Sequence, residues 1–312
     1  MSDLQLFRLH SPGAATELAS HAAPLEKTLQ ALIEGQMETF LGVRLLASEY
    51  VTGKTHRGRI DSLGIDENGC PVIVEYKRHS TENVINQGLF YLDWLLDHQA
   101  EFRWLVLEKL GKEVAQHIEW KGTRLLCIAS DFTRYDQYAV QQIPRNIELL
   151  RYKLFGDDLL LLELVNAQSV ADATAVKPAA NDVPAAGKET PKAPGKDKSL
   201  AEQLALAPPH IQLLYEQTTS FLLSLGDDVQ QKELKLYTAF RRLKNFACVI
   251  VYPNRLLLTL KLDPATLALE DGFSRDVSQV GHWGTGDVEL CLLGYLDLQR
   301  AQGLLERSYA EN

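Results

Sequence analysis

Two acidic residues and a lysine occupy positions that a short β-hairpin would bring together. Asp61 opens one arm, and Glu75 and Lys77 end the other arm, which runs from Val72 to Lys77. Successive side chains of a strand point to opposite faces, so Glu75 and Lys77 share a face. Asn68-Gly69 between two apolar arms is typical of a hairpin turn, because both residues tolerate positive φ. Antiparallel pairing of the arms then places Asp61 close to Glu75.

These three residues have a joint chemistry. Ionisable groups at the end of an apolar strand are costly to bury unless each has a partner or a task. Hard cations such as Mg²⁺ take oxygen ligands and use one or two carboxylates. A cation held by Asp61 and Glu75 would lower the pKa of a bound water and stabilise negative charge on a phosphate. Lys77 would position that water or offset the charge on phosphorus. The pattern therefore predicts metal-assisted hydrolysis of a phosphate ester.

The pattern of Asp61 followed by Glu75-x-Lys77 resembles the PD-(D/E)XK nuclease superfamily. It is most similar to the nuclease domain of the mismatch-specific endonuclease family, whose motifs are Gly-x-Ile-Asp-x-Leu, Asp-x-x-Gly and Val-x-Val-Glu-x-Lys-Arg. The matching residues are Gly58, Ile60, Asp61, Leu63, Asp66, Gly69, Val72, Val74, Glu75, Lys77 and Arg78. The resemblance extends from Pro24 to Trp94. It implies a restriction-endonuclease-like fold, Mg²⁺ or Mn²⁺ as cofactor, and DNA as substrate.

The resemblance also implies further metal ligands. The main-chain carbonyl of Tyr76 is expected to join Asp61 and Glu75 at the metal. Glu26, in the first turn of a helix that Pro24 opens, is expected to contribute to the same site. The alternative for Glu26 is an ordinary first-turn glutamate stabilised by the helix dipole. Glu49 lies on the strand before Asp61, where members of the resembling family often carry a glutamate. It either supports the metal ligands from behind or pairs with a cation on a neighbouring strand, and we expect the second.

Gln87 and Tyr91 match a Gln-x-x-x-Tyr pair that the resembling family carries on the helix after Glu-x-Lys. Residues four apart lie on one side of a helix, so the pair can reach toward the site together. The resemblance implies that they hold a phosphate or orient the metal-bound water. The alternative for Tyr91 is a core aromatic residue with a hydrogen-bonded hydroxyl.

Hydrophobic periodicity predicts an α/β protein with a mixed sheet flanked by helices, followed by a smaller α+β domain. Residues 1–165 are the nuclease-like domain, 166–199 a flexible linker rich in Ala, Pro and Lys, and 200–312 a domain of unknown role. The linker lacks the large apolar residues that folding requires. In the first domain we expect single helices over 24–42 and 102–116, a helix capped by Ser80 or Thr81, and a central strand over 123–130. In the last domain we expect strands over 234–240, 246–252 and 255–262.

The last domain resembles a compact uncharacterised domain that was once labelled a predicted transport protein. Residues 245–248, the glycine-rich loop 282–287 and Ser308-Tyr309 carry this likeness, which implies no activity. The loop lacks the Gly-Lys-Ser/Thr of a phosphate loop. Two interpretations of the loop are open. It is either a tight turn that tucks in the Trp283 side chain or a small binding site for a base or a peptide.

Composition limits the function classes. The net charge is −9, and 23 acidic residues outnumber 17 basic ones in the first 165 residues. This balance counts against strong non-specific duplex binding, which depends on neutralising phosphates. Basic residues gather around the hairpin as either a nucleic-acid rim or a solvated sheet edge: Lys54, His56, Arg57, Arg59, Lys77, Arg78 and His79.

The sequence shows no apolar run of membrane-spanning length, and Met1-Ser2-Asp3 begins nothing like a signal peptide. Its four cysteines are scattered without a Cys-x-x-Cys pair, which argues against a structural zinc site or a disulfide scaffold. We therefore expect a cytoplasmic protein without a membrane partner.

The leading hypothesis is a metal-dependent endonuclease that hydrolyses phosphodiester bonds in DNA, with a role in DNA repair or in defence against foreign DNA. A homodimer fits this chemistry, because double-strand cutting by a single-site enzyme needs two copies. One alternative is a nucleic-acid or protein binding module that keeps the fold without turnover. Another is a C-terminal sensor or oligomerisation domain that directs the nuclease. The preferred DNA structure, DNA versus RNA, the oligomeric state and the pathway stay open at this point.

Overall fold

The structure is a computed structural model that describes residues 4–10, 13–53, 57–78, 84–168 and 198–312. The chain divides into two compact units, Met1–Ser169 and Val170–Asn312. Within the described ranges, no helix combines the length and the apolar character that crossing a bilayer requires.

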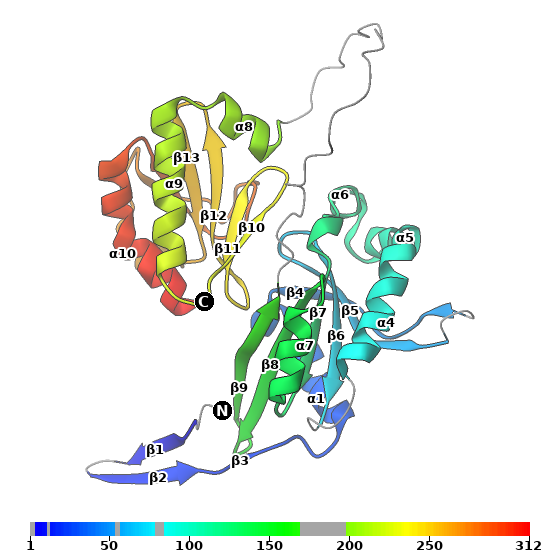
Figure 1. The fold of residues 1–312 in the computed structure, drawn as a ribbon. Helices are drawn as coiled ribbons and strands as arrows, with labels where there is room; N and C mark the ends of the chain where they lie inside the picture. Colours follow the sequence, from blue (N-terminus) through cyan, green and yellow to red (C-terminus); the bar gives the residue numbers. More distant parts are fainter. Residues whose placement is uncertain (1–3, 11–12, 54–56, 79–83, 169–197) are drawn as a thin grey trace, which may run out of the picture. The chain divides into compact units, whose positions relative to one another are not determined.

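Unit 1 contains a mixed sheet built around the predicted hairpin (Figure 1). Its described strands follow the order β3-β8-β7-β6-β5-β4, with β9 also paired to β8. β6, β7 and β8 run parallel, and the other pairings are antiparallel. The strands are β3 (Ser20–His21), β4 (Val43–Val51), β5 (Arg59–Asp66), β6 (Pro71–Lys77), β7 (Arg124–Ala129), β8 (Asn146–Phe155) and β9 (Leu159–Gln168). A separate hairpin joins β1 (Leu6–His10) to β2 (Ala14–Leu18).

Helices cover both faces of this sheet. α4 and α7 lie over one face and α1 over the other (Figure 1). The helices of unit 1 are α1 (Glu26–Gly35), α2 (Met37–Leu41), α4 (Val84–Asp97), α5 (Gln99–Leu110), α6 (Lys112–Gln116), the short 3-10 helix η1 (Trp120–Gly122) and α7 (Arg134–Gln141). Every residue of β6 and β7 is buried, as expected for central strands covered on both faces.

Two predicted helices of unit 1 are interrupted. The helix expected over 24–42 begins at Glu26 and breaks at Gln36, next to Gly35, because glycine is a weak helix former. The helix expected over 102–116 ends at Leu110, where Gly111 adopts a φ of 89° that favours glycine. The predicted cap at Ser80 or Thr81 lies outside the described residues.

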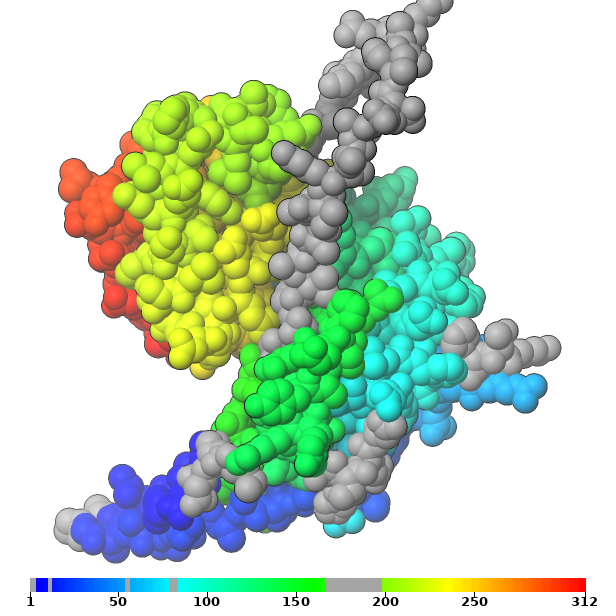
Figure 2. All heavy atoms as spheres, in the orientation of Figure 1, coloured from blue at the N-terminus to red at the C-terminus, as the bar shows by residue number. Residues whose placement is uncertain are grey.

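Unit 2 is an α+β domain with one antiparallel sheet in the order β10-β11-β12-β13-β15-β14. The three α-helices described in this unit pack on one face of the sheet, and Figure 2 shows the helical residues 200–224 at the front of the unit. The strands are β10 (Gln230–Glu233), β11 (Thr238–Arg241), β12 (Asn245–Tyr252), β13 (Arg255–Leu260), β14 (Ser274–Asp276) and β15 (Val288–Leu292). The helices are α8 (Leu200–Leu206), α9 (Pro209–Ser224), the 3-10 helix η2 (Pro264–Thr266) and α10 (Tyr295–Glu311).

The structure confirms the predicted mixed α/β sheet flanked by helices and the separate α+β domain. Several strand boundaries differ from the prediction, and two of the differences have a clear cause. The strand expected over 234–240 is a turn followed by β11, because the Leu234 amide donates to the Tyr237 carbonyl at 2.9 Å and closes that turn. β9 continues to Gln168, three residues into the predicted linker, by pairing with β8. Residues 169–197 of that linker lie outside the described part.

Candidate active site

The hairpin register brings the two predicted acids together. Ser62 pairs with Val74, which sets Asp61 opposite Glu75 on the adjacent strand. The Asp61 amide donates to Oε1 of Glu75 at 3.2 Å, and the Tyr76 amide donates to Oδ2 of Asp61 at 3.0 Å. Each carboxylate is thus held by the main chain of the other strand. The pair therefore belongs to the hydrogen-bonded framework of the sheet.

Glu75 is strongly affected by its surroundings. Its side chain is fully buried, and Oε2 has no hydrogen-bond partner among the described residues. Burial, together with the neighbouring Asp61 charge, raises the pKa of Glu75 to about 9. Burial also raises the pKa of Asp61, against the opposing effects of the Tyr76 amide and the Lys77 charge. Without a further cation, the site therefore favours a protonated Glu75 at neutral pH.

Lys77 lies at the end of β6 and is largely buried. Its Nζ contacts Oε1 of Glu26 at 3.0 Å, and the Glu26 side chain is 37% exposed. Glu26 comes from the first turn of α1, on the opposite side of the sheet from α4. In the structure, Glu26 therefore forms an ion pair with Lys77. The expected role of Glu26 as a metal ligand stays a prediction.

A polar network behind the two acids was missed by the sequence analysis. The buried Gln30 on α1 donates from Nε2 to the Asp61 carbonyl at 2.8 Å and to Oε1 of Glu34 at 2.9 Å. Glu34 accepts from the Ser62 hydroxyl at 2.6 Å, and that hydroxyl lies 3.1 Å from the Tyr76 hydroxyl. A signal was present, since Gln30 and Glu34 are four residues apart and share one helix face.

Tyr91 supports the start of β5. Its buried hydroxyl accepts from the Arg59 amide at 3.2 Å. Its ring occupies the place of a side chain at Gly58, because a Cβ built there would lie 2.3 Å from Cε1 of Tyr91. These contacts match the alternative of a core aromatic residue with a bonded hydroxyl. Gln87 is half-buried on α4, and no hydrogen bond between described residues links it to Asp61 or Glu75.

Glu49 contacts cations, as the sequence analysis expected. It pairs with Lys27 at 2.8 Å and with Arg59 on the neighbouring strand. The Lys27 hydrogen bond holds the pKa of Glu49 below its usual value. Arg59 is thus engaged by an acid, and Lys54, His56 and His79 of the basic cluster lie outside the described residues.

The donor set suits a hard cation. Asp61, Glu75 and the Tyr76 carbonyl offer oxygen atoms only, and Oε2 of Glu75 is a buried acceptor with no described partner. In the described part of the chain, no group of three or more His, Cys, Asp and Glu side chains is arranged to hold a metal. Mg²⁺ keeps several waters and uses one or two carboxylates, so the two acids fit its requirements.

Comparison with known proteins gives a domain match, a relative and two solved structures. Residues 200–312 match the model of a family described as a domain of unknown function, DUF5655. An uncharacterized protein of Haemophilus influenzae is 27% identical over 299 residues, which cover 95% of this chain and 96% of the relative. The domain match lies in unit 2 and gives that unit no activity.

The two solved structures share low identity with this chain. A repair endonuclease from Pyrococcus abyssi is 18% identical, with a TM-score of 0.28 over 43% of this chain. EndoMS in complex with double-stranded DNA is 16% identical, with a TM-score of 0.24 over 47% of this chain. The matches span 49% and 64% of those proteins.

Proposed function

We propose that unit 1 is a divalent-metal-dependent endonuclease that hydrolyses phosphodiester bonds in DNA. The observation that carries the proposal is the buried Glu75 carboxylate, which lies opposite Asp61 and has one oxygen without a described partner. DNA as the substrate rests on the resemblance of the Asp61…Glu75-x-Lys77 motif to the nuclease superfamily.

Each residue has a role in this proposal. Asp61, Glu75 and the Tyr76 carbonyl would hold Mg²⁺ or Mn²⁺, which supplies a Lewis acid and a bound water of lowered pKa. Lys77 would orient the attacking water, and Glu26 holds its ammonium in place at 3.0 Å. Gln87 would contact the phosphate from α4.

A cleavage assay tests the proposal. The substrates are supercoiled plasmid, a mismatched duplex and single strands, each with Mn²⁺, Mg²⁺ or EDTA. Asp61→Asn and Lys77→Met should each lower the cleavage rate at least about a hundredfold, since one removes a ligand and the other the group that orients water. Asp93→Asn is the matched control, because Asp93 is an exposed acid on α4. Metal-dependent cutting that persists in both site variants would exclude this site.

Calorimetry with Mn²⁺ separates the nuclease from a binding module without turnover. The wild-type protein should bind Mn²⁺, and Glu75→Gln should weaken that binding. Mn²⁺ binding that depends on Glu75, without cleavage of any substrate, would favour the binding module. Binding that is unchanged in Glu75→Gln would contradict the proposed ligand set.

A further inference from the structure

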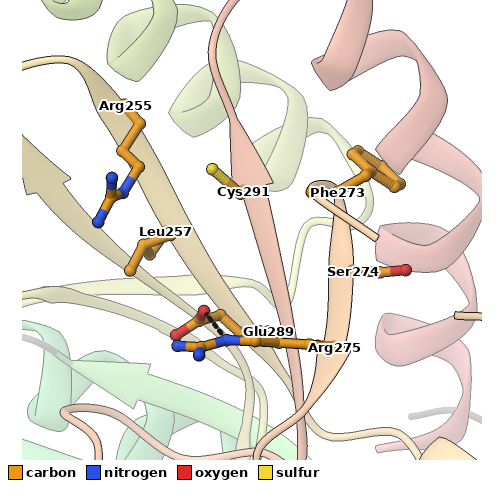
Figure 3. A pocket seen from close by; sticks show the side chains of 8 residues that line it. Arg255, Leu257, Phe273, Ser274, Arg275, Glu289 and Cys291 are labelled. Atoms are coloured by element: carbon orange, nitrogen blue, oxygen red, sulfur yellow. Dashed lines mark hydrogen bonds and ion pairs between the residues drawn. The ribbon is translucent and has the colours of Figure 1, made fainter. Parts of the chain in front are cut away.

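We propose that unit 2 has a binding site for a small organic anion, in a pocket on the face of its sheet that lies opposite the helices. The cavity has a volume of about 260 Å³. Figure 3 shows the side chains that surround it. The residues that line it are Arg255, Leu257, Gly272, Phe273, Ser274, Arg275, Glu289 and Cys291. This site is independent of the function proposed for unit 1.

Strand alternation creates the pocket. Leu256 and Leu258 of β13 point into the core beneath the helices, so Arg255 and Leu257 point to the other face. Leu257 pairs with Cys291 of β15, and Arg275 of β14 pairs with Glu289 of β15. Polar and apolar side chains of three adjacent strands therefore meet on one face. Figure 3 shows the Phe273 ring and the Ser274 hydroxyl directed away from them.

Arg255 is the observation that points to an anion. Its Nε is buried and has no hydrogen-bond partner, and no acidic side chain in the described part of the chain pairs with it. A buried donor without an acceptor is unfavourable. The guanidinium carbon of Arg255 lies 5.2 Å from the centre of the Tyr252 ring. This contact restricts the orientation of the planar guanidinium group. A carboxylate or a phosphate would supply the missing acceptors in the geometry that arginine prefers.

Arg275, the second arginine of the pocket, is paired with an acid, so the net charge of the lining is positive. Arg275 pairs with Glu289 at 2.6 Å, and the Glu289 side chain is only 7% exposed. That pair is neutral as a whole, so the lining carries the unbalanced charge of Arg255. Arg275 is 62% exposed and adds donors at the rim. The lining therefore favours an anionic ligand over a neutral or cationic one.

Leu257 and Cys291 provide the apolar part of the surface. Figure 3 shows the Cys291 sulfur directed toward the side of the pocket that Arg255 and Leu257 occupy. An apolar group next to the anionic head would contact these two side chains. The expected ligand class is a small carboxylate or phosphate ester with an apolar body.

Cys291 provides a direct reporter of occupancy in the full-length protein. Cys70, Cys127 and Cys248 are buried, whereas Cys291 is partly exposed. Iodoacetamide, which is neutral, should therefore label Cys291 first. Burial raises the pKa of this thiol, so the labelling is best done at alkaline pH. The measurement is the labelling rate of Cys291, followed by mass spectrometry of its peptide.

Four probes distinguish the elements of the proposed ligand. Benzoate and phenyl phosphate carry a ring and an anionic head, benzyl alcohol a ring without charge, and inorganic phosphate a charge without a ring. We expect saturable protection of Cys291 by one or both ringed anions and weaker protection by the other two. Whichever of benzoate and phenyl phosphate protects at the lower concentration identifies the preferred anionic group as a carboxylate or a phosphate. Equal protection by benzyl alcohol, or protection by none of the four, would overturn the proposal.

Variants link protection to Arg255. Arg255→Gln should lower the affinity for the protecting ligand at least about tenfold, because it removes the positive charge and the paired N–H donors of the guanidinium group. Arg255→Lys keeps the positive charge, so its affinity for the ligand should lie between that of Arg255→Gln and that of the wild type. Arg307→Gln is the matched control, since Arg307 pairs with Glu311 on α10. Unchanged protection in folded Arg255→Gln, verified by circular dichroism, would also overturn the proposal.

Discussion

Strand β5 carries an acid near each end: Asp61 is partly buried and Asp66 is buried, and their surroundings differ. At one end Asp61 faces Glu75 across the hairpin. At the other end Asp66 pairs with Arg124, whose Nε lies 3.4 Å from Oε1 of Glu148. The Asp66 carboxylate also accepts from two amides of the hairpin turn, at 2.9 and 2.8 Å. Two acids therefore lie together at each end of β5. A guanidinium group lies between Asp66 and Glu148, whereas none lies between Asp61 and Glu75 among the described residues.

Arg124 makes the second end of β5 a structural cluster, whereas the first end is a candidate site. Arg124 is buried, and although burial acts to lower its pKa, Asp66 and Glu148 raise it. That cluster is completed by the chain. The cation near Asp61 and Glu75 is Lys77, which is itself shared with Glu26. A divalent cation would complete the first cluster as Arg124 completes the second.

The largest expected effect comes from breaking the completed cluster. Arg124→Met leaves two buried acids without their cation and should lower the free energy of unfolding by about 3–5 kcal/mol. Urea unfolding followed by tryptophan fluorescence measures it, since Trp94, Trp104 and Trp120 lie in unit 1. Arg103→Met, at an exposed position of α5, is the control and should change stability by about 0.5 kcal/mol or less. Equal stability of the two variants would show that the Arg124 cluster is dispensable.

A second effect should appear in the pH dependence of unit 1. The folded pKa of Glu75 is raised to about 9, so the unfolded chain releases this proton first as pH rises. Stability in EDTA should therefore fall between the ordinary glutamate pKa and about pH 9. Glu75→Gln should flatten this fall, and so should saturating Mn²⁺ in the wild type. Identical slopes for Glu75→Gln and wild type in EDTA would contradict the assignment of the raised pKa.

The smallest effect should come from Glu26→Gln. The Glu26–Lys77 pair is partly exposed on the glutamate side, so its loss should cost about 1 kcal/mol or less of stability. If Glu26 acts only by holding Lys77, Mn²⁺ affinity should stay close to that of wild type while the cleavage rate falls. A large loss of Mn²⁺ affinity would instead make Glu26 a metal ligand.

The sequence predicted the hairpin well because its signals are local. Asn68-Gly69 and the alternation after Val72 determine which side chains share a face, and the pairing of Asp61 with Glu75 follows. The cluster around Arg124 was not predicted, because Asp66, Arg124 and Glu148 come from three strands that are far apart in sequence. Gln30 was missed for a related reason: whether a polar helix residue faces solvent or a strand carbonyl depends on how the helix docks.

The contact between Gly58 and Tyr91 has a consequence for how this chain can diverge. The tyrosine ring fills the volume that any side chain at position 58 would need. A side chain at position 58 is therefore tolerated only if the residue at position 91 is smaller or its ring moves. Across homologous sequences, a side chain at position 58 should therefore occur together with a residue smaller than tyrosine at position 91. The hydrogen bond that the Tyr91 hydroxyl accepts from the Arg59 amide spans 32 residues of the chain.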